Sequence, residues 1–312
     1  FDALRRLVRE MELVGELVEV KRGCLATPER VGLVVGVLHC HPRGFGFVVP
    51  VREADGEDVY VSAEDQSSAM HGDLVAVSVS QGRRRGRLGP SGKVARVVRH
   101  ARSELIGVFR RDRSVAHVEP DDPKLFRDVY IADEDRGGAQ PGDKVRVRIT
   151  AWPSRHLNPE GAVVEVLGPE GEPRVQTLAV IREYGLSDEF PRDVLEAARG
   201  LPGAARPADL EGRLDLRDEL TFTIDPEDAK DHDDAVSIRR VKDGWELGVH
   251  IADVAHYVRD MDPIDREARH RGTSVYLPGH TLPMLPERLS NDLCSLREGC
   301  DRLTRSVLMR FD

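Results

Sequence analysis

The sequence predicts a mainly β fold with an α/β part: two small closed β-barrels in tandem, followed by the N-terminal part of a mixed α/β domain. Three observations predict it. The chain repeats itself after 70 residues, each repeat consists of short β-rich runs, and from about Arg213 the pattern becomes mixed α/β. Short strands separated by turn residues are typical of small barrels.

The repeat appears when the chain is shifted by 70 residues. Between Arg43 and Val79, 13 of 37 positions carry the same residue as the position 70 residues later. Chance would give about two such identities, so we expect two copies of one module. In the first copy the expected strands are residues 31–37, 46–49, 58–61 and 74–79.

The chain is expected to divide into five segments. The first resembles the end of a winged helix, because an amphipathic helix (Leu4, Leu7, Val8 and Met11 at helical spacing) precedes a hairpin. A Pro- and Gly-rich linker with one helix precedes the α/β part. The expected segments are the winged-helix-like remnant (1–28), barrel 1 (29–100), barrel 2 (101–170), the linker with its helix at 191–199 (171–212), and the incomplete α/β part (213–312).

Composition excludes several classes of protein. Hydrophobic residues make up 40% of the 312 residues, enough for packed cores, so global disorder is excluded. No apolar run reaches the roughly 18 residues of a membrane helix, and no signal peptide opens the chain. We expect a cytoplasmic protein with no membrane partner. Because the chain begins at Phe1 rather than Met, we also expect a piece of a longer protein.

The four cysteines argue against two kinds of site. They are too few and too scattered for a disulfide framework, and none forms a C-x-x-C pair. We therefore expect neither a disulfide partner nor a zinc site.

Charge is distributed unevenly along the chain. The net charge of −9 argues against a nucleic-acid partner, but the stretch from Arg83 to Arg113 holds eleven Lys or Arg and only two acidic residues. Local fields steer polyanions, so this stretch favours a nucleic-acid partner. The alternative is a solvated loop whose charge serves solubility.

Aromatic residues in the first repeat indicate what such a partner would touch. In Gly-Phe-Gly-Phe-Val (residues 44–48), Phe45 and Phe47 point the same way on a strand, and Tyr60 on the next strand can join them. Exposed rings on a small barrel stack on unpaired bases. The module resembles the cold-shock domain, an OB-fold, which implies RNA binding through Phe45, Phe47 and Tyr60. The alternative is that these rings belong to the core. In the second copy Val115 and His117 replace the two phenylalanines, so we expect weaker stacking there.

The strongest motif is acidic. Four aspartates follow the spacing D-x5-D-x-D-D from Asp225 to Asp234, between apolar strand-like flanks. Such a cluster repels itself unless a positive charge compensates it, and its hard oxygen ligands suit Mg²⁺ or Mn²⁺. A calcium EF-hand is excluded, since Val236 and Lys242 stand where its loop needs Gly and Glu.

This acidic segment resembles the RNB catalytic domain of the RNase II and RNase R exoribonucleases. The resemblance spans Arg213 to Asp312, and Arg-Gly-Thr-Ser-Val-Tyr (residues 271–276) is closer to the RNase R type. Two cold-shock-like modules ahead of an RNB domain also follow the order of that family.

The resemblance implies a role for several residues. Asp233 would be the most critical carboxylate, and Tyr276 would stack on the base at the RNA 3′ end; the alternative for Tyr276 is a core aromatic. His232 is expected to be structural or solvent-facing, and His250 to be a satisfied core histidine. The catalytic residues and ligands of Mg²⁺ (or Mn²⁺) would be Asp225, Asp231, Asp233 and Asp234.

The implied function is that of a processive 3′→5′ exoribonuclease. It would act as a monomer on the 3′ end of single-stranded RNA and release nucleoside 5′-monophosphates in RNA turnover. The family's downstream glutamate and arginine lie beyond Asp312, so this chain alone is expected to be incomplete and can be inactive. The alternative is a non-catalytic RNA-binding or chaperone module with a vestigial or truncated RNB domain. The intact aspartates weigh against it, because a vestigial site has no reason to keep self-repelling carboxylates.

Overall fold

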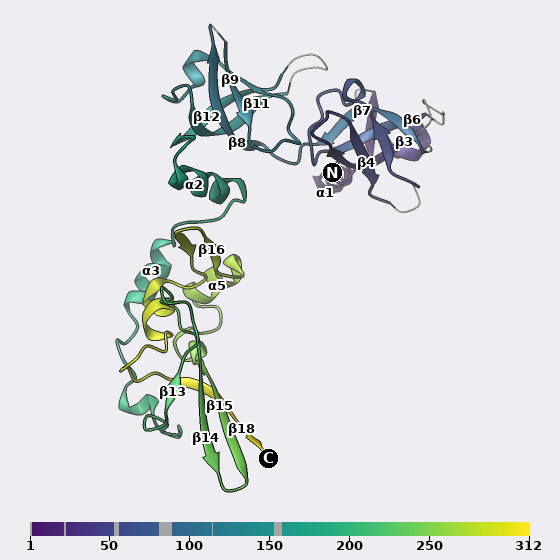
Figure 1. Cartoon of the computed structure of the whole chain (residues 1–312). Coiled ribbons are helices and arrows are strands. Elements are labelled where there is room, and N and C mark those ends of the chain that lie inside the picture. Colours follow the sequence, from purple (N-terminus) through teal and green to yellow (C-terminus); the bar gives the residue numbers. More distant parts are fainter. Residues whose placement is uncertain (1, 22, 53–55, 81–88, 114, 153–157) are drawn as a thin grey trace. The chain divides into compact units, whose positions relative to one another are not determined.

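The computed structural model describes residues 2–21, 23–52, 56–80, 89–113, 115–152 and 158–312 (Figure 1). The chain divides into two compact units, Phe1–Leu186 and Ser187–Asp312, and each is described by itself.

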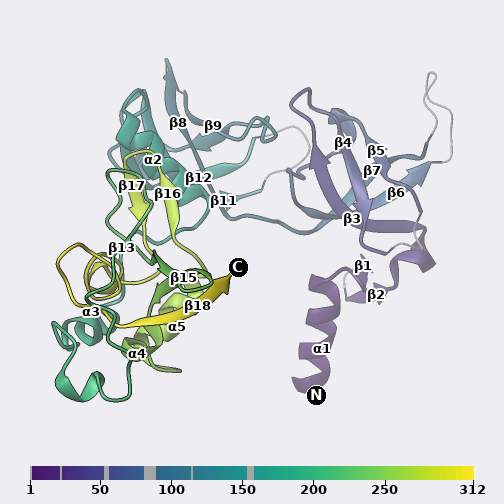
Figure 2. The same cartoon turned by 60° about the horizontal axis from the view of Figure 1, so that its bottom comes forward.

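The first unit begins with a helix and a hairpin (Figure 2). Helix α1 (Asp2–Leu13) buries none of its residues, and Leu4 is 60% exposed. Strands β1 (Val18–Lys21) and β2 (Cys24–Ala26) pair antiparallel. The helix and hairpin expected from the sequence are therefore present.

A five-stranded closed barrel follows, in the order β3-β4-β5-β7-β6. All neighbours pair antiparallel except β5 and β7, whose parallel pairing closes the barrel at Tyr60 and Ser91. The strands are β3 (Leu33–Cys40), β4 (Gly46–Pro50), β5 (Val59–Val61), β6 (Leu74–Ser80) and β7 (Ser91–Arg99).

The second barrel repeats this topology strand for strand. Its order is β8-β9-β10-β12-β11, and β10 and β12 close it in parallel at Tyr130 and Glu160. The tandem barrels predicted from the 70-residue repeat are thus confirmed. The strands are β8 (Glu104–Asp112), β9 (Val115–Pro120), β10 (Val129–Ile131), β11 (Asp143–Ala151) and β12 (Glu160–Pro169).

Glycine allows the first two strands of each barrel to approach closely. A Cβ at Gly36 would lie 2.3 Å from the carbonyl oxygen of Val49, and one at Gly107 would lie 2.2 Å from that of Glu119. Any larger residue would push β3 away from β4, or β8 away from β9.

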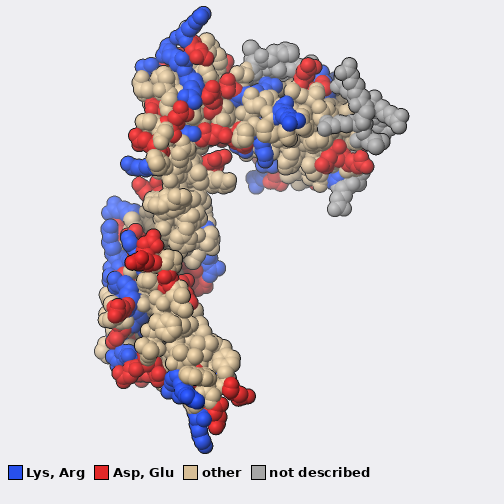
Figure 3. Space-filling model, viewed as in Figure 1, with Lys and Arg blue, Asp and Glu red and all other residues tan. Residues whose placement is uncertain are grey.

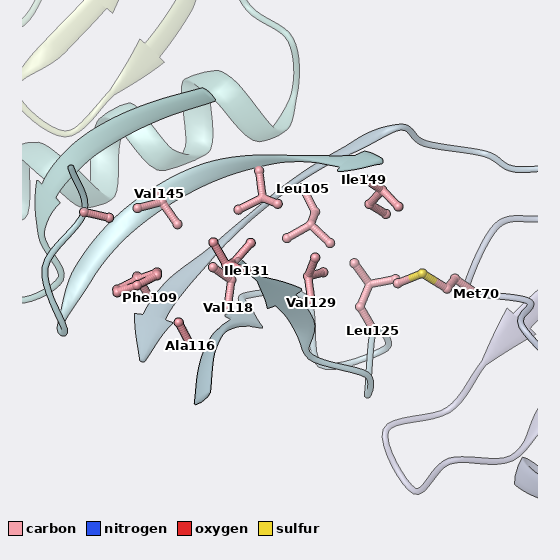
Figure 4. Close-up of a cluster of buried hydrophobic side chains, with 12 residues drawn as sticks. Met70, Leu105, Phe109, Ala116, Val118, Leu125, Val129, Ile131, Val145 and Ile149 are labelled. Atoms are coloured by element: carbon pink, nitrogen blue, oxygen red, sulfur yellow. The ribbon is translucent and has the colours of Figure 1, made fainter. Parts of the chain in front are cut away.

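Branched aliphatic side chains fill both barrels. In the first, Leu38, Val48, Val59 and Val75 are almost completely buried. Figure 4 shows the second core, in which Phe109 lies with side chains from β8, β9, β10 and β11. Burying each such side chain contributes roughly 1.5–3 kcal/mol.

Helix α2 (Pro173–Glu183) completes the first unit. It buries Val175, Ala179 and Ile181 and contacts β8, β11 and β12. The sequence predicts only a linker at these residues, and helix α2 corrects that prediction. The expected helix at 191–199 is present as α3 (Arg192–Arg199) in the second unit.

The second unit is built around a four-stranded antiparallel sheet. Its order is β13-β14-β15-β18, and helices α4 and α5 and the hairpin β16–β17 lie between β15 and β18 in the chain. Side chains of helices α3, α4 and α5 meet in one core with Leu289 and Leu293. These two leucines belong to a π-helical turn. The elements are β13 (Thr221–Phe222), β14 (Asp234–Val241), β15 (Gly244–Ala252), α4 (Val254–Tyr257), α5 (Pro263–Arg271), β16 (Val275–Leu277), β17 (His280–Leu282), the π-helical turn (Leu289–Leu293) and β18 (Thr304–Phe311).

Short 3₁₀ helices connect several of these elements, at Pro28–Val31, Ala63–Asp65, Asp133–Asp135 and Pro207–Asp209. Among the residues that the structure describes, no helix is both long enough and apolar enough to cross a membrane.

Candidate nucleic-acid interface and acidic site

Three aromatic rings of the first barrel gather on its outside. The rings of Phe45, Phe47 and Tyr60 lie with centroids 5.7–6.0 Å apart. All three are half-buried and none joins the aliphatic core, so the structure places them on the surface and not in the core. The register explains the cluster, because Phe47 lies directly opposite Tyr60 across β4 and β5.

Two histidines, which sequence reasoning missed, extend this cluster. His39 on β3 lies opposite Phe47, and the ring of His41 stacks on Phe45 with centroids 4.6 Å apart and an 8° interplanar angle. Their alternation around Cys40 is the signal that could have found them, since residues i and i+2 share one face of a strand. We call His39, His41, Phe45, Phe47 and Tyr60 the aromatic surface.

The equivalent face of the second barrel carries fewer rings. His117 lies opposite Tyr130, which is 44% exposed, and Val115 stands where Phe45 stands in the first copy. Arg110 lies opposite His117, but its guanidinium is bound to the carboxylates of Glu119 and Glu170. This face therefore offers less stacking surface than the first, in line with the sequence.

The basic stretch from Arg83 to Arg113 contributes less free charge than its composition suggests. Figure 3 shows Lys and Arg side chains among Asp and Glu over the face in view. Arg83, Arg84, Arg85 and Arg87 lie outside the described residues. Exposed cations such as Lys93 and Arg99 are left to attract a polyanion. Four other arginines form ion pairs: Arg96 with Glu19, Arg102 with Asp122, Arg110 with Glu119 and Glu170, and Arg111 with Asp133.

In the second unit, the acidic segment (residues 225–234) runs between β13 and the first residue of β14. Asp225, Asp233 and Asp234 are exposed, and Asp231 is half-buried. Oδ2 of Asp225 lies 2.9 Å from Nδ1 of His232, and hydrogen bonding to His232 lowers the pKa of Asp225. His232 therefore joins the two ends of the segment, which fits a structural role.

Tyr276 on β16 is attached to the same segment. Its hydroxyl donates a hydrogen bond to Oδ2 of Asp231 at 2.6 Å, while the residue stays 65% exposed. This bond, together with burial and the charges of Asp231 and Asp233, raises the pKa of Tyr276. The alternative of a core aromatic is therefore wrong, and the ring is accessible beside two of the four aspartates.

The four aspartates from Asp225 to Asp234 are the candidate ligands of the metal site expected from the sequence. Carboxylate oxygens are the donors that Mg²⁺ prefers, so the donor chemistry fits. Within the described part of the chain, however, no three Asp, Glu, His or Cys side chains converge closely enough to hold a metal ion. Asp225 is engaged by His232 and Asp231 by Tyr276 instead.

His250 on β15 is a buried, satisfied histidine, as expected. Nε2 lies 2.9 Å from the hydroxyl of Ser237 on β14, and Nδ1 lies 2.8 Å from that of Ser306 on β18. Burial lowers the pKa of His250. Its role is to tie three strands of the sheet together.

Comparison with known proteins agrees with this architecture. Residues 36–97 match the ribonuclease B OB domain, residues 117–191 the cold shock domain, and residues 213–312 the RNB domain. Ribonuclease R of Acidithiobacillus ferrooxidans is 38% identical over the whole chain, which covers 70% of that relative. The chain belongs to the ribonuclease R family.

The chain spans only part of the length of the relatives that it matches. Ribonuclease R of Thermotoga maritima is 43% identical over 99% of the chain, and the chain spans 43% of its length. A solved structure titled as Mycoplasma genitalium RNase R in complex with ribose methylated single-stranded RNA is also similar, with a TM-score of 0.78 and 28% identity. That likeness covers 89% of this chain and 44% of the solved chain.

Proposed function

We propose that this member of the ribonuclease R family is a processive, metal-dependent 3′→5′ exoribonuclease that hydrolyses single-stranded RNA to nucleoside 5′-monophosphates. The observation that carries the proposal is the Tyr276–Asp231 hydrogen bond, which holds an exposed ring beside the acidic segment. A terminal base stacked on that ring would bring the last phosphodiester close to the carboxylates. The protein would work in the cytoplasm as a monomer, in RNA turnover.

RNA would first bind the aromatic surface. The rings of the aromatic surface offer faces to successive unpaired bases. Stacking of this kind tolerates any base sequence. Exposed cations such as Lys93 and Arg99 would add phosphate contacts. The complex between Mycoplasma genitalium RNase R and single-stranded RNA supports this choice of ligand.

At the acidic segment, Asp225, Asp231, Asp233 and Asp234 would hold Mg²⁺ or Mn²⁺. When bound, the ion would supply Lewis-acid stabilisation of the attacking and leaving oxygens of the phosphodiester. The chain's own part is to hold the carboxylates in place, and the hydrogen bond between His232 and Asp225 links the two ends of the segment. Tyr276 holds Asp231 through its hydroxyl, and its ring would orient the terminal base.

The second candidate function is a non-catalytic RNA-binding or chaperone module. One observation favours it, since no three metal-ligating side chains converge among the described residues. A single experiment separates the two candidates. The chain is incubated with single-stranded RNA and Mg²⁺ or EDTA, and soluble products are identified by chromatography.

Nucleoside 5′-monophosphates that appear with Mg²⁺ and not with EDTA are the result we expect. RNA that is retained on a native gel but never shortened would favour the binding module as the function of this chain.

A further inference from the structure

The backbone of the acidic segment is anchored by one side chain that lies far from it in the sequence. Ser295 follows the π-helical turn and is completely buried. Its hydroxyl accepts a hydrogen bond from the backbone N–H of His232 at 3.2 Å and donates one to the carbonyl oxygen of Lys230 at 2.7 Å. A serine hydroxyl has one donor and two acceptor positions, so it can bridge both groups at once.

The neighbouring backbone strengthens this anchor. The N–H of Leu296 donates to the carbonyl oxygen of His232 at 2.8 Å, so both backbone groups of His232 are bound to residues 295–296. Ser295 is itself fixed, because its N–H donates to the carbonyl oxygen of Asp292 and its own carbonyl oxygen accepts from Nε of Arg302, each at 3.0 Å.

The other end of the aspartate run is tied to the sheet. The N–H of Ala252 donates to the carbonyl oxygen of Asp233 at 2.9 Å, and Asp234 then pairs with Ile251 as β14 begins. Ser295 thus fixes the backbone of residues 230–232, which precede strand β14. Residues 230 and 232, which it bridges, flank Asp231.

Two side-chain contacts depend on where this backbone lies. Tyr276 reaches Asp231 at 2.6 Å, and His232 reaches Asp225 at 2.9 Å. Small movements of residues 230–232 would break both contacts, because hydrogen bonds weaken steeply with distance and angle.

We propose that Ser295 is a positioning residue that fixes the acidic segment and so sets the spacing at which its carboxylates bind a divalent cation. The proposal rests on the proposed function, since it concerns the same metal-binding carboxylates. Groups that orient metal ligands typically change metal affinity by roughly 10- to 100-fold when removed.

The test compares Ser295→Ala with Ser290→Ala. Ser290 lies on the π-helical turn that precedes Ser295, but its hydroxyl contacts Asn291 and not the acidic segment. Mn²⁺ alone is the probe, and its binding to the 312-residue chain is followed by electron paramagnetic resonance. Hydrogen exchange at the amide of His232 reports on the anchor directly, and circular dichroism checks that each variant is folded.

We expect Ser295→Ala to weaken Mn²⁺ binding by roughly 10- to 100-fold and to speed exchange at the His232 amide. Ser290→Ala should change neither. If the chain binds Mn²⁺ and Ser295→Ala binds it equally well, the positioning role is wrong while the proposed function stands. If the unaltered chain binds no Mn²⁺ at all, the metal-dependent function is itself contradicted, and the positioning role with it.

Discussion

The hydroxyl of Tyr276 donates a hydrogen bond to Oδ2 of Asp231 at 2.6 Å, although the two residues are 45 positions apart in the chain. The contact places an exposed aromatic ring at the edge of the acidic segment. It gives Tyr276 two separable properties, a ring that can stack on a base and a hydroxyl that holds a carboxylate.

The first prediction separates these two properties. Tyr276→Ala removes the ring, and loss of one base stack costs about 1–3 kcal/mol, or roughly 5- to 150-fold in affinity. Tyr276→Phe keeps the ring, so stacking should persist. The measurement is the fluorescence of a single-stranded RNA whose 3′-terminal base is 2-aminopurine, which is quenched on stacking. Equal quenching by the unaltered chain and Tyr276→Ala would show that the ring does not receive the terminal base.

The second prediction concerns the aromatic surface. Phe45→Ala and Phe47→Ala should each weaken binding of single-stranded RNA by about 1–3 kcal/mol, because each removes a stacking face. Phe126→Ala is the control, since Phe126 is 37% exposed on the second barrel and lies outside the aromatic surface. Fluorescence anisotropy of a labelled RNA measures all three. An equal effect of the three changes would mean that the aromatic surface is not the binding face.

The third prediction follows from the buried His250. Its pKa is lowered by burial, so between its folded pKa and about 6.5 the unfolded chain binds more protons than the folded chain. Its contribution to stability is therefore complete above pH 6.5 and is lost as the pH falls toward the folded pKa, at up to about 1.4 kcal/mol per pH unit. Urea unfolding from pH 7.5 to 5.5 checks this.

The matched variant for that experiment is His250→Asn, which cannot titrate. At pH 7.5 the free energy of unfolding of the variant should be lower than that of the unaltered chain. Between pH 7.5 and 5.5 it should change less with pH. A variant whose stability falls as steeply as that of the unaltered chain would assign the pH dependence to other groups.

The fourth prediction concerns the thiols. Cys24 and Cys300 are exposed, whereas Cys40 and Cys294 are buried, and burial raises their pKa to about 12 and about 11. Because the thiolate is the reactive form, only the exposed pair should react with a thiol reagent at pH 8. All four should react in denaturant. Rapid reaction of a third thiol in the native chain would show that one of the buried sites is open.

The sequence was sufficient for features that depend on local pattern. The 70-residue repeat gave the paired barrels, and the period-two spacing of Phe45 and Phe47 gave their shared face. Short strands such as β5 could be predicted because Gly, Pro and charged residues bound them.

Features that depend on partners far away in the chain could not be predicted. Arg96 is paired with Glu19, 77 residues away, so counting charges overestimated the free charge of the basic stretch. Residues 173–183 are flanked by Pro and Gly, which is typical of a linker. Helix α2 forms there because the barrel surface buries Val175 and Ile181. The spacing of the four aspartates, in turn, did not reveal that His232 and Tyr276 engage two of them.

The most direct measurement compares Asp233→Asn with Asp243→Asn, a control in the exposed turn between β14 and β15. Each is incubated with 5′-labelled single-stranded RNA and Mg²⁺, and cleavage on a denaturing gel is read beside retention on a native gel. We predict that the unaltered chain and Asp243→Asn shorten the RNA from its 3′ end, whereas Asp233→Asn retains the RNA uncut. Normal shortening by Asp233→Asn, with RNA binding unchanged, would contradict the assignment of the acidic segment as the catalytic site.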